Sequence, residues 1–405
     1  MVNSADAVSR ASTTMAPEQR ALLCCARSSL DDASRQRLRA IAAEGLDGRM
    51  LVAEAGRHGV STLLSRHIRE VFPPGKADEL VEELRADVHA TVVASLAAAA
   101  ELAALVSALK DARVPVLAIK GPISAMLCYG DLGVRRYGDL DLLIRPSDLP
   151  SARRCVEARG YAPRFALTDA WQARLVRTQS ELGFLHADGR RAVDLHWRLL
   201  PPRFSFVPDD VGPFARRASV RIGSDDVPTL GLEATLLFLL LHGIKHDWER
   251  LSWLCDVAEL LRRHPELDWN EVMQWSSAPG RRRLIDVGLA LVHGLLDAPV
   301  PMSVLARAER DPAVHRIAAT LARKLFTAPG APPSWLPRSI FSMQLLLAME
   351  RPSDRLRFVH DVVFRPTPLE WRAVPLPPAL APVFYLVRPA RLFWKHVWPG
   401  RATAA

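Results

Sequence analysis

The sequence predicts an α+β fold, in which a small mixed sheet with flanking helices lies mid-chain between N-terminal and C-terminal helical regions. Three observations lead to this prediction. Apolar residues recur at helical spacing over residues 17–113. Short apolar runs bounded by proline, glycine and aspartate follow over residues 114–230, a pattern typical of strands. Helical spacing then returns in residues 231–405.

Length and composition limit the possible classes of protein. A chain of 405 residues can hold two or three domains and bury a large core. The formal charge of +9 suits an anionic partner such as a nucleotide, although the Arg- and Ala-rich composition of a GC-rich genome would also produce it. The five cysteines lack paired zinc spacing, so we expect no disulfide framework and a reducing, cytoplasmic location.

The first region is predicted to be helical after a short leader. Residues 1–16 are rich in serine, alanine and threonine and lack an apolar centre, so we expect a disordered leader, with Met15 as an alternative start. Helices are expected at Pro17–Ser28, Asp32–Ala43 and Gly48–His58, with a long one from Ala77 to Lys110. One side of the long helix carries Leu80, Leu84, Val88, Val92 and Leu96.

The long helix also contains the part of the chain that most resembles a membrane span. The stretch Thr91–Leu109 is apolar, but Glu101 interrupts it and most of its apolar residues are alanines. We therefore expect a packed helix and no transmembrane segment. The N-terminal helices are expected to pack on the sheet region without chemistry of their own.

The sheet region begins with a buried strand at Val116–Ile119, followed by the turn Lys120-Gly121-Pro122 and a short helix through Tyr129. A loop with Arg135 and Arg136 then leads to a second strand that follows Gly138. Further helices are expected at Asp148–Gly160 and Thr168–Thr178, and strands at Ser180–His186 and Arg191–Leu199. The last two strands are joined through Asp188-Gly189, a strong turn signal.

Three aspartates in these strands are the candidate catalytic residues. Because side chains alternate between the faces of a strand, Asp139 and Asp141 point the same way, while Leu140 and Leu142 point into the core. Carboxylates side by side repel each other and favour a bound cation. Mg²⁺ fits, because it takes oxygen ligands and shares them with phosphates. On the strand Arg191–Leu199, Asp194 points away from Val193 and Leu195 and is available as a further carboxylate.

The stretch LAIKGPISAMLCYGDLGVRRYGDLDLLI resembles the nucleotidyltransferase superfamily that has the fold of DNA polymerase beta. In particular it is similar to a bacterial, mostly uncharacterised branch with a Lys-Gly turn, some members of which are encoded among natural-product genes. The resemblance implies that Asp139, Asp141 and Asp194 bind Mg²⁺ (or Mn²⁺) for two-metal phosphoryl transfer. The match VDLHW supports Asp194 as the third carboxylate.

The resemblance also implies residues that bind the nucleoside triphosphate. The wider superfamily carries Gly-Ser or Gly-Gly at the turn, whereas this chain has Lys120 and Gly121. The amide of Gly121 can meet a phosphate at a helix N-terminus, and Lys120 can supply charge, although Lys120 can equally cap a strand end. Arg135 and Arg136 are further phosphate candidates, with Gly138 beside the aspartates, although a loop arginine can also be simply solvated.

A later helical segment, HGIKHDWERLSWLCDVAEL, is similar to the helical partner region of the same family. The resemblance implies that Lys245 and His246 face the nucleotide or the acceptor across a cleft; a polar helix face at a domain junction is the alternative. His242 and His246 have a spacing that can bind zinc, but the glutamate of the metalloprotease pattern is replaced by Gly243.

From these features we expect a Mg²⁺-dependent nucleotidyltransferase that moves a nucleoside monophosphate from a nucleoside triphosphate to an acceptor hydroxyl. The acceptor, a small molecule or a protein side chain, is unknown. The alternative is a binding protein that keeps the fold with little or no catalysis and serves a biosynthetic or toxin–antitoxin partner. No RNA-binding module is recognisable, so nucleic acid is not expected as a partner.

Overall fold

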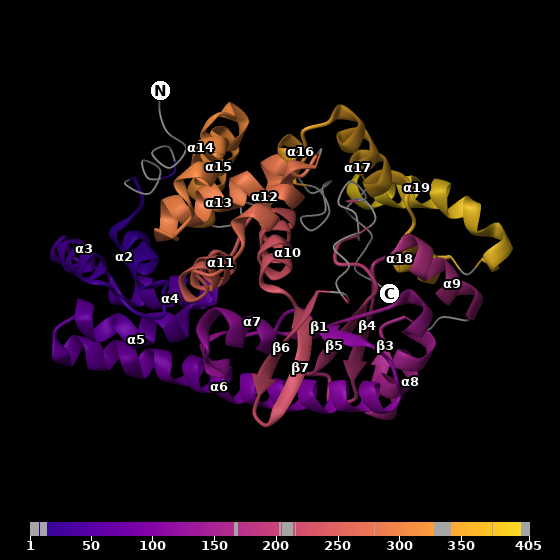
Figure 1. Cartoon of the computed structure of the whole chain (residues 1–405), viewed down its shortest axis with the longest axis horizontal. Helices are drawn as coiled ribbons and strands as arrows, with labels where there is room; N and C mark the ends of the chain where they lie inside the picture. The colour runs from indigo at the N-terminus through magenta and orange to yellow at the C-terminus, as the bar shows by residue number, and fades with distance from the viewer. Residues whose placement is uncertain are drawn as a thin grey trace.

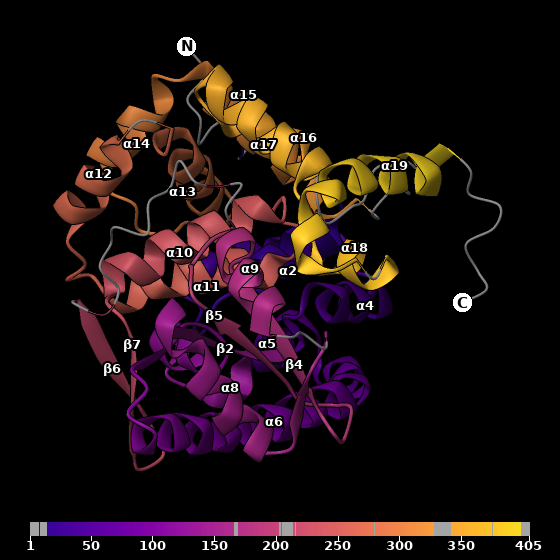
Figure 2. The ribbon, with the colours of Figure 1, turned by 90° about the vertical axis from the view of Figure 1, so that its right-hand side faces the viewer.

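The computed structural model describes residues 14–165, 169–201, 216–278, 280–327, 342–374 and 376–397, together with Val8, Phe204 and Phe214. The expected leader, residues 1–16, lies almost entirely outside the described residues. Figures 1 and 2 show a mixed sheet with the long helix α6 (Pro74–Asp111) along one face and a body of helices over the other. This arrangement confirms the predicted α+β class.

The central sheet has five strands in the order β1-β2-β5-β4-β3. Its strands are β1 (Val116–Ala118), β2 (Asp139–Ile144), β3 (Tyr161–Pro163), β4 (Glu181–His186) and β5 (Ala192–His196). The pair β2 and β5 is parallel, and the other neighbours are antiparallel, so the sheet is mixed as predicted. The register places Asp141 opposite Asp194 and Leu142 opposite Leu195.

The two faces of β2 pack against different elements, as strand alternation predicts. Leu140, Leu142 and Ile144 join the core beneath the sheet, which α6 and α8 (Leu149–Ala158) complete. On the other face Leu143 lies in a small cluster with Phe238 of helix α10 (Leu232–Lys245). Helix α10 therefore covers the face of the sheet that carries the aspartates.

Three strands were not expected from the sequence. The strand β3 is only three residues long, and the hairpin β6 (Arg217–Ile222) and β7 (Asp225–Leu230) forms a separate two-stranded sheet. Figure 1 shows the hairpin beside β1, and the Thr229 hydroxyl donates a hydrogen bond to the Ala118 carbonyl over 2.7 Å. Most side chains of β6 are exposed, so the apolar pattern that identifies a strand is weak there.

The N-terminal helices are α2 (Pro17–Cys25), α3 (Asp32–Ala43), α4 (Gly48–His58) and α5 (Ser61–Val71), the last of which was not predicted. On α6 the buried side begins with Leu80 and Leu84, as expected, but Leu96 is 52% exposed. The buried face moves instead to Ser95, Ala99 and Leu102, because a 3.6-residue turn drifts away from residues chosen four apart.

Among the described helices, α6 is long and apolar enough to cross a membrane by length and composition alone, which is weak evidence because core helices pass the same test. It packs against α5, α8 and the sheet. All five cysteines lie among the described residues and none forms a disulfide bond. Burial raises the pKa of the Cys25 thiol far above its usual range, so this cysteine is a poor nucleophile.

The C-terminal part is helical, as predicted. Beyond α10 it contains α11 (Leu251–Arg263), α12 (Trp269–Ser277), α13 (Arg282–Leu296), α14 (Met302–Glu309), α15 (Pro312–Leu325), α16 (Met343–Ala348), α17 (Pro352–Phe364), α18 (Pro368–Ala373) and α19 (Phe384–Val397). Residues of α2–α5 and of α10–α17 share one apolar core, so the two helical regions form one body above the sheet (Figure 2).

Candidate active site

Three predicted aspartates lie on the face of the sheet that α10 covers. Asp139 and Asp141 belong to β2, and Asp194 stands directly opposite Asp141 on the parallel strand β5. Ligand atoms of Asp141, Asp194 and His196 lie within 4.8 Å of one another. Asp139 is not part of that trio, yet it is near enough for its charge to act on Asp194. The structure thus brings the three carboxylates together, as strand alternation and the family resemblance led us to expect.

Lys120 lies at the centre of this group. Gly121 has φ +60°, a conformation in which a side chain would be strained, and this turn directs the chain from β1 into α7 (Pro122–Ser124). The Lys120 Nζ atom lies 2.9 Å from Asp141 Oδ1 and 5.5 Å from the centre of the Phe238 ring. The Lys120 side chain therefore forms an ion pair with a carboxylate of the cluster and does not simply cap the end of β1.

Two further residues, which the sequence did not lead us to select, complete the group. His196 Nε2 lies 3.0 Å from Asp141 Oδ1, and its Nδ1 lies 3.2 Å from Glu181 Oε2. Glu181 is directly opposite His196 in the β4–β5 register. His196 could have been found by alternation, because it shares the face of Asp194. Glu181 required the hairpin register, which the sequence leaves open.

Charge is unevenly shared within this cluster of carboxylates. Burial would raise the pKa of Asp141, but Lys120 and His196 outweigh burial and hold that pKa well below its usual range. Burial and the neighbouring Asp139 instead raise the pKa of Asp194 to about 6. Burial and Asp141 likewise raise the pKa of Asp139. Asp139 and Asp194 are thus the members whose negative charge is least compensated.

The donor atoms fit a divalent cation. Asp141 Oδ2 is buried and accepts no hydrogen bond from the described part of the chain, which leaves a carboxylate oxygen open to a further ligand. The side chains of Asp139 and Asp194 also form no hydrogen bond with a described residue. A set of carboxylate oxygens suits Mg²⁺ or Mn²⁺, whereas the nearby imidazole nitrogen is already engaged with Asp141.

The structure places Arg135 differently from its expected role. Its Nη2 atom lies 2.8 Å from Asp256 Oδ2 on α11, and the arginine side chain is only 13% exposed. The Tyr129 hydroxyl donates to Asp256 Oδ1 over 3.0 Å. Because its guanidinium is committed to this buried pair, Arg135 does not fit the role of a triphosphate ligand. It instead fixes the loop that precedes Asp139.

Arg136 and Gly138 occupy open positions on that loop. The Arg136 side chain is 70% exposed and lies 3.9 Å from Asp87. No atom lies within 4 Å of the position that a side-chain carbon would take at Gly138. Space is therefore available next to Asp139, and the phosphate-binding role of both residues stays a prediction.

Lys245 and His246 lie at the C-terminal end of α10. The charge of Lys245 contributes to holding the pKa of Glu181 below its usual range, against the effect of burial, so Lys245 is near the edge of the cluster. The His246 ring lies 4.8 Å from the His242 ring and 5.4 Å from Trp253. Burial and Lys120 lower the pKa of His242, which is thus neutral beside the lysine.

An arginine and a glycine next to Asp194 were also missed. Gly183 pairs with Asp194 across β4 and β5. A side-chain carbon at Gly183 would lie 2.9 Å from Asp194 Oδ1 and 3.2 Å from Arg164 Cδ. The exposed Arg164 therefore lies over the glycine, next to two carboxylates, where its charge acts on Asp139. Its position after the unpredicted strand β3 gave no signal in the sequence.

Comparison with known proteins agrees with this geometry. A family profile described as uncharacterised nucleotidyltransferase matches residues 44–297, which include the sheet, the aspartates and α10. The chain belongs to this nucleotidyltransferase family. No curated protein sequence matches the chain. A nucleotidyltransferase-like protein from Paracoccidioides brasiliensis, described as antigenic, is similar over 53% of this chain and 97% of its own, with 16% identity and a TM-score of 0.33, too low to support an argument.

The match covers more of the chain than the strands that carry the aspartates. It spans the N-terminal helices from residue 44 and both sides of the cluster, including α10 with Lys245 and His246. The matched stretch is thus longer than residues 114–230, in which the sequence predicts the strands of the sheet. The family description, however, names no acceptor.

Proposed function

We propose that the chain transfers a nucleoside monophosphate from a nucleoside triphosphate to an acceptor hydroxyl and releases pyrophosphate. The observation that carries this proposal is the convergence of Asp139, Asp141 and Asp194 on one face, with a buried oxygen of Asp141 left without a hydrogen-bond partner among the described residues. Asp139, Asp141 and Asp194 would hold Mg²⁺ or Mn²⁺. When bound, such ions neutralise phosphate charge and lower the pKa of an attacking hydroxyl.

The protein's own residues would divide the remaining work. The acceptor oxygen forms a bond to the α-phosphorus while the bond from that phosphorus to the pyrophosphate oxygen breaks. The Asp194 side chain forms no hydrogen bond with a described residue, and its carboxylate is the one we assign to receive the hydroxyl proton. Lys120, Arg164 and Lys245 place positive charge around the carboxylates, where a triphosphate would bind.

The contact of Lys120 with Asp141 also favours an alternative function, the binding of a nucleotide without its transfer. Its ammonium group already compensates Asp141, and His196 bonds to the same oxygen. A site in which a lysine replaces part of the cationic charge could bind a nucleotide without transferring it. The alternative is therefore a nucleotide-binding protein of the same fold that serves a partner.

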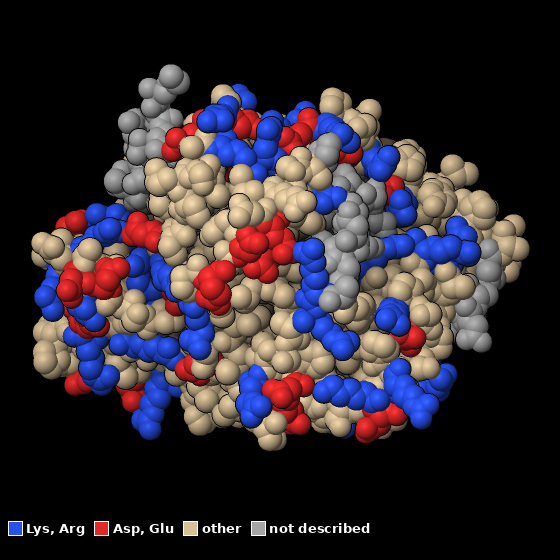
Figure 3. Space-filling view, viewed as in Figure 1, with Lys and Arg blue, Asp and Glu red and all other residues tan. Residues whose placement is uncertain are grey.

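The charge of the surface does not favour a third function, the modification of RNA. On the face shown in Figure 3, Lys and Arg side chains are interspersed with acidic ones and do not form one continuous basic patch. A protein that binds RNA through its backbone phosphates would need such a patch.

Labelled nucleotides can test the proposal directly. The full chain is incubated with Mg²⁺, cell extract and each of the four nucleoside triphosphates, labelled at either the α- or the γ-phosphate. We expect the α-label to become attached to an acceptor and the γ-label to leave as pyrophosphate. Transfer of the γ-label would indicate a kinase, and nucleotide binding without transfer would support the alternative. Asp194→Asn should abolish transfer, while Asp225→Asn, an exposed change in the distant β6–β7 hairpin, should not.

A further inference from the structure

The two oxygens of Asp141 have different surroundings. Its Oδ1 atom has two partners, the Lys120 Nζ atom at 2.9 Å and the His196 Nε2 atom at 3.0 Å. Its Oδ2 atom is buried and receives no hydrogen bond from the described residues. Asp141 therefore has one oxygen, and not two, available to a cation.

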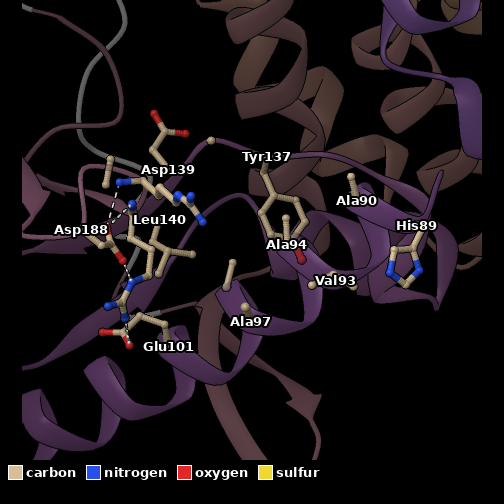
Figure 4. Close-up of a pocket in the computed structure, with 15 residues that line it drawn as sticks. His89, Ala90, Val93, Ala94, Ala97, Glu101, Tyr137, Asp139, Leu140 and Asp188 are labelled. Carbon is tan, nitrogen blue, oxygen red and sulfur yellow. Dashed lines mark hydrogen bonds and ion pairs between the residues drawn. The ribbon is translucent and has the colours of Figure 1, made fainter. Parts of the chain in front are cut away.

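The neighbouring carboxylates lie on the same face of the sheet as Asp141, the face that α10 covers. Figure 4 shows the Asp139 carboxylate directed away from α6, whereas the pocket of about 560 Å³ in that view is walled by α6 on the opposite face. Asp194 stands opposite Asp141, and ligand atoms of the two residues lie within 4.8 Å of each other. A cation on Asp141 Oδ2 thus has Asp194 beside it and lies outside that pocket.

Lys120 occupies the place beside Asp141 that a second cation would need. Two-metal sites hold their ions about 3.5–4 Å apart, so the ions share a carboxylate that gives one oxygen to each. Here the oxygen left for a second ion is Oδ1, which already faces the lysine ammonium. Asp139 and Glu181 also attract that ammonium, and the Phe238 ring lies 5.5 Å from it. A second divalent ion at Oδ1 would meet a positive charge that is held from several sides.

The charges around Asp141 support the same conclusion. Before a nucleotide binds, four acidic groups face three basic ones and one histidine, so a single divalent cation already outweighs the acidic excess. Arg135 stays outside this balance because it is paired with Asp256. The described groups that act on the cluster are Asp139, Asp141, Asp194, Glu181, Lys120, Arg164, Lys245 and His196.

We propose that this site uses a single divalent cation, held by Asp141 Oδ2 together with Asp139 and Asp194, and that the Lys120 ammonium takes the place of a second cation. The inference rests on the proposed nucleotidyl transfer for the nucleotide that joins the site. It gives Lys120 a specific role, the supply of fixed positive charge where a two-metal site would place an ion.

The number of bound ions can be measured without any transfer. The full chain is dialysed to equilibrium against Mn²⁺, alone or with a saturating ATP analogue in which a methylene group replaces the oxygen between the α- and β-phosphates. We expect one Mn²⁺ per chain in both cases, after subtraction of the Mn²⁺ held by free analogue, and the electron paramagnetic resonance spectrum of an isolated ion. No bound Mn²⁺, or two ions per chain with the spectrum of a coupled pair, would overturn the proposal.

Removing the ammonium gives the second half of the test. Lys120→Met keeps a long side chain without the charge and frees Asp141 Oδ1, so this variant should bind two Mn²⁺ with the analogue and show the coupled pair. Lys245→Met removes a positive charge from the edge of the cluster and is the matched control, which should still bind one. One ion in Lys120→Met, or two in Lys245→Met, would show that Lys120 does not replace an ion.

A melting curve first establishes that each variant is folded. If Lys120→Met is not, Lys120→Gln takes its place with the same expected count of two. The count in the unaltered chain decides in either case, because two ions there contradict the proposal whatever the variants do.

The two proposals can fail separately. If the chain holds two Mn²⁺ and transfers the α-label, the single-cation proposal fails while nucleotidyl transfer stands. If the chain holds one Mn²⁺ and Lys120→Met holds two, but the labelled nucleotides are not transferred, nucleotidyl transfer fails and the role of Lys120 in the cation site remains.

Discussion

Two buried aspartates of this protein, Asp141 and Asp256, are each paired with a basic side chain but have opposite surroundings. Asp256 on α11 receives the Tyr129 hydroxyl at one oxygen and faces Arg135 at the other. Asp141 on β2 has both its partners, Lys120 and His196, at a single oxygen. Its second oxygen is buried and unused by the described residues.

This difference distinguishes a structural ion pair, at Asp256, from a candidate cation site, at Asp141. Around Asp256 one negative and one positive charge balance, so nothing further is required and the loop before β2 is held in place. Around Asp141 three other carboxyl groups, Asp139, Asp194 and Glu181, lie near Lys120 and the His196 imidazole, with the charges of Arg164 and Lys245 at the edge of the cluster. A cluster with more negative than positive groups is costly to keep buried, and a divalent cation relieves that cost.

The largest expected effect comes from removing charge from the carboxylate cluster around Asp141. The double change Asp139→Asn and Asp194→Asn should reduce transfer of the α-label by at least about 10⁴-fold, because two of the proposed metal ligands and the proposed proton acceptor are lost. Without metal, the melting temperature should stay the same or rise, since fewer carboxylates repel each other. Transfer within tenfold of the unaltered chain would show that these carboxylates are not catalytic; Asp225→Asn is the control.

The next largest effect is a loss of stability when the buried ion pair between Asp256 and Arg135 is broken. Asp256→Asn leaves the buried Arg135 guanidinium without a counter-ion, which typically costs about 3–5 kcal/mol. Asp141→Asn should cost clearly less, because Lys120 still has Asp139 and Glu181 nearby. Urea unfolding of both variants measures the difference. Equal losses would mean that Asp141 is as much a structural contact as Asp256, and the comparison would fail.

These two regions also show what the sequence could predict. Strand alternation placed Asp139 and Asp141 on one face, and the family resemblance added Asp194 from a neighbouring strand; the observed register sets Asp141 opposite Asp194. The same rule would have selected His196. Arg135, by contrast, was read as a phosphate ligand, since its partner Asp256 lies on a helix far along the chain and only tertiary packing joins them. Arg164 follows a three-residue strand that has no periodicity to detect, and placing Gly183 opposite Asp194 required the register of the β4–β5 hairpin.

A third prediction concerns the pH dependence of stability that a fully hydrogen-bonded buried contact produces. His58 is fully buried, and its Nδ1 accepts a hydrogen bond from the Leu251 amide over 3.1 Å, which requires an unprotonated nitrogen. Burial, then Arg57 and Arg250, lower the pKa of His58 to about 3; Glu54, 3.5 Å from Nε2, opposes this shift but cannot free Nδ1. The unfolded chain takes up this proton near pH 6.5, so stability should fall as the pH drops below that value.

Between pH 7.5 and pH 5 this histidine should remove about 2 kcal/mol from the free energy of unfolding. His58→Gln keeps an acceptor for the Leu251 amide but cannot gain a charge, so its unfolding free energy should change less over the same range. Urea unfolding at both pH values measures the two slopes. If the slopes are equal, the acid sensitivity comes from other groups and His58 is not a proton-sensitive contact.

The smallest expected effect tests how precisely the Asp194 carboxylate must be positioned for transfer. An alanine at Gly183 would place its Cβ atom 2.9 Å from Asp194 Oδ1, so the carboxylate has to rotate away from Asp141. We expect kcat for transfer to fall about tenfold, a loss of about 1.4 kcal/mol in the transition state. Stability should be unchanged or slightly higher, because glycine within a strand is less favourable than alanine by roughly 0.5–1 kcal/mol. Gly75→Ala, where no atom lies within 4 Å of the added carbon, is the matched control. A variant that loses stability while its kcat stays the same would show that Gly183 serves the packing of the sheet and that the position of Asp194 does not limit transfer.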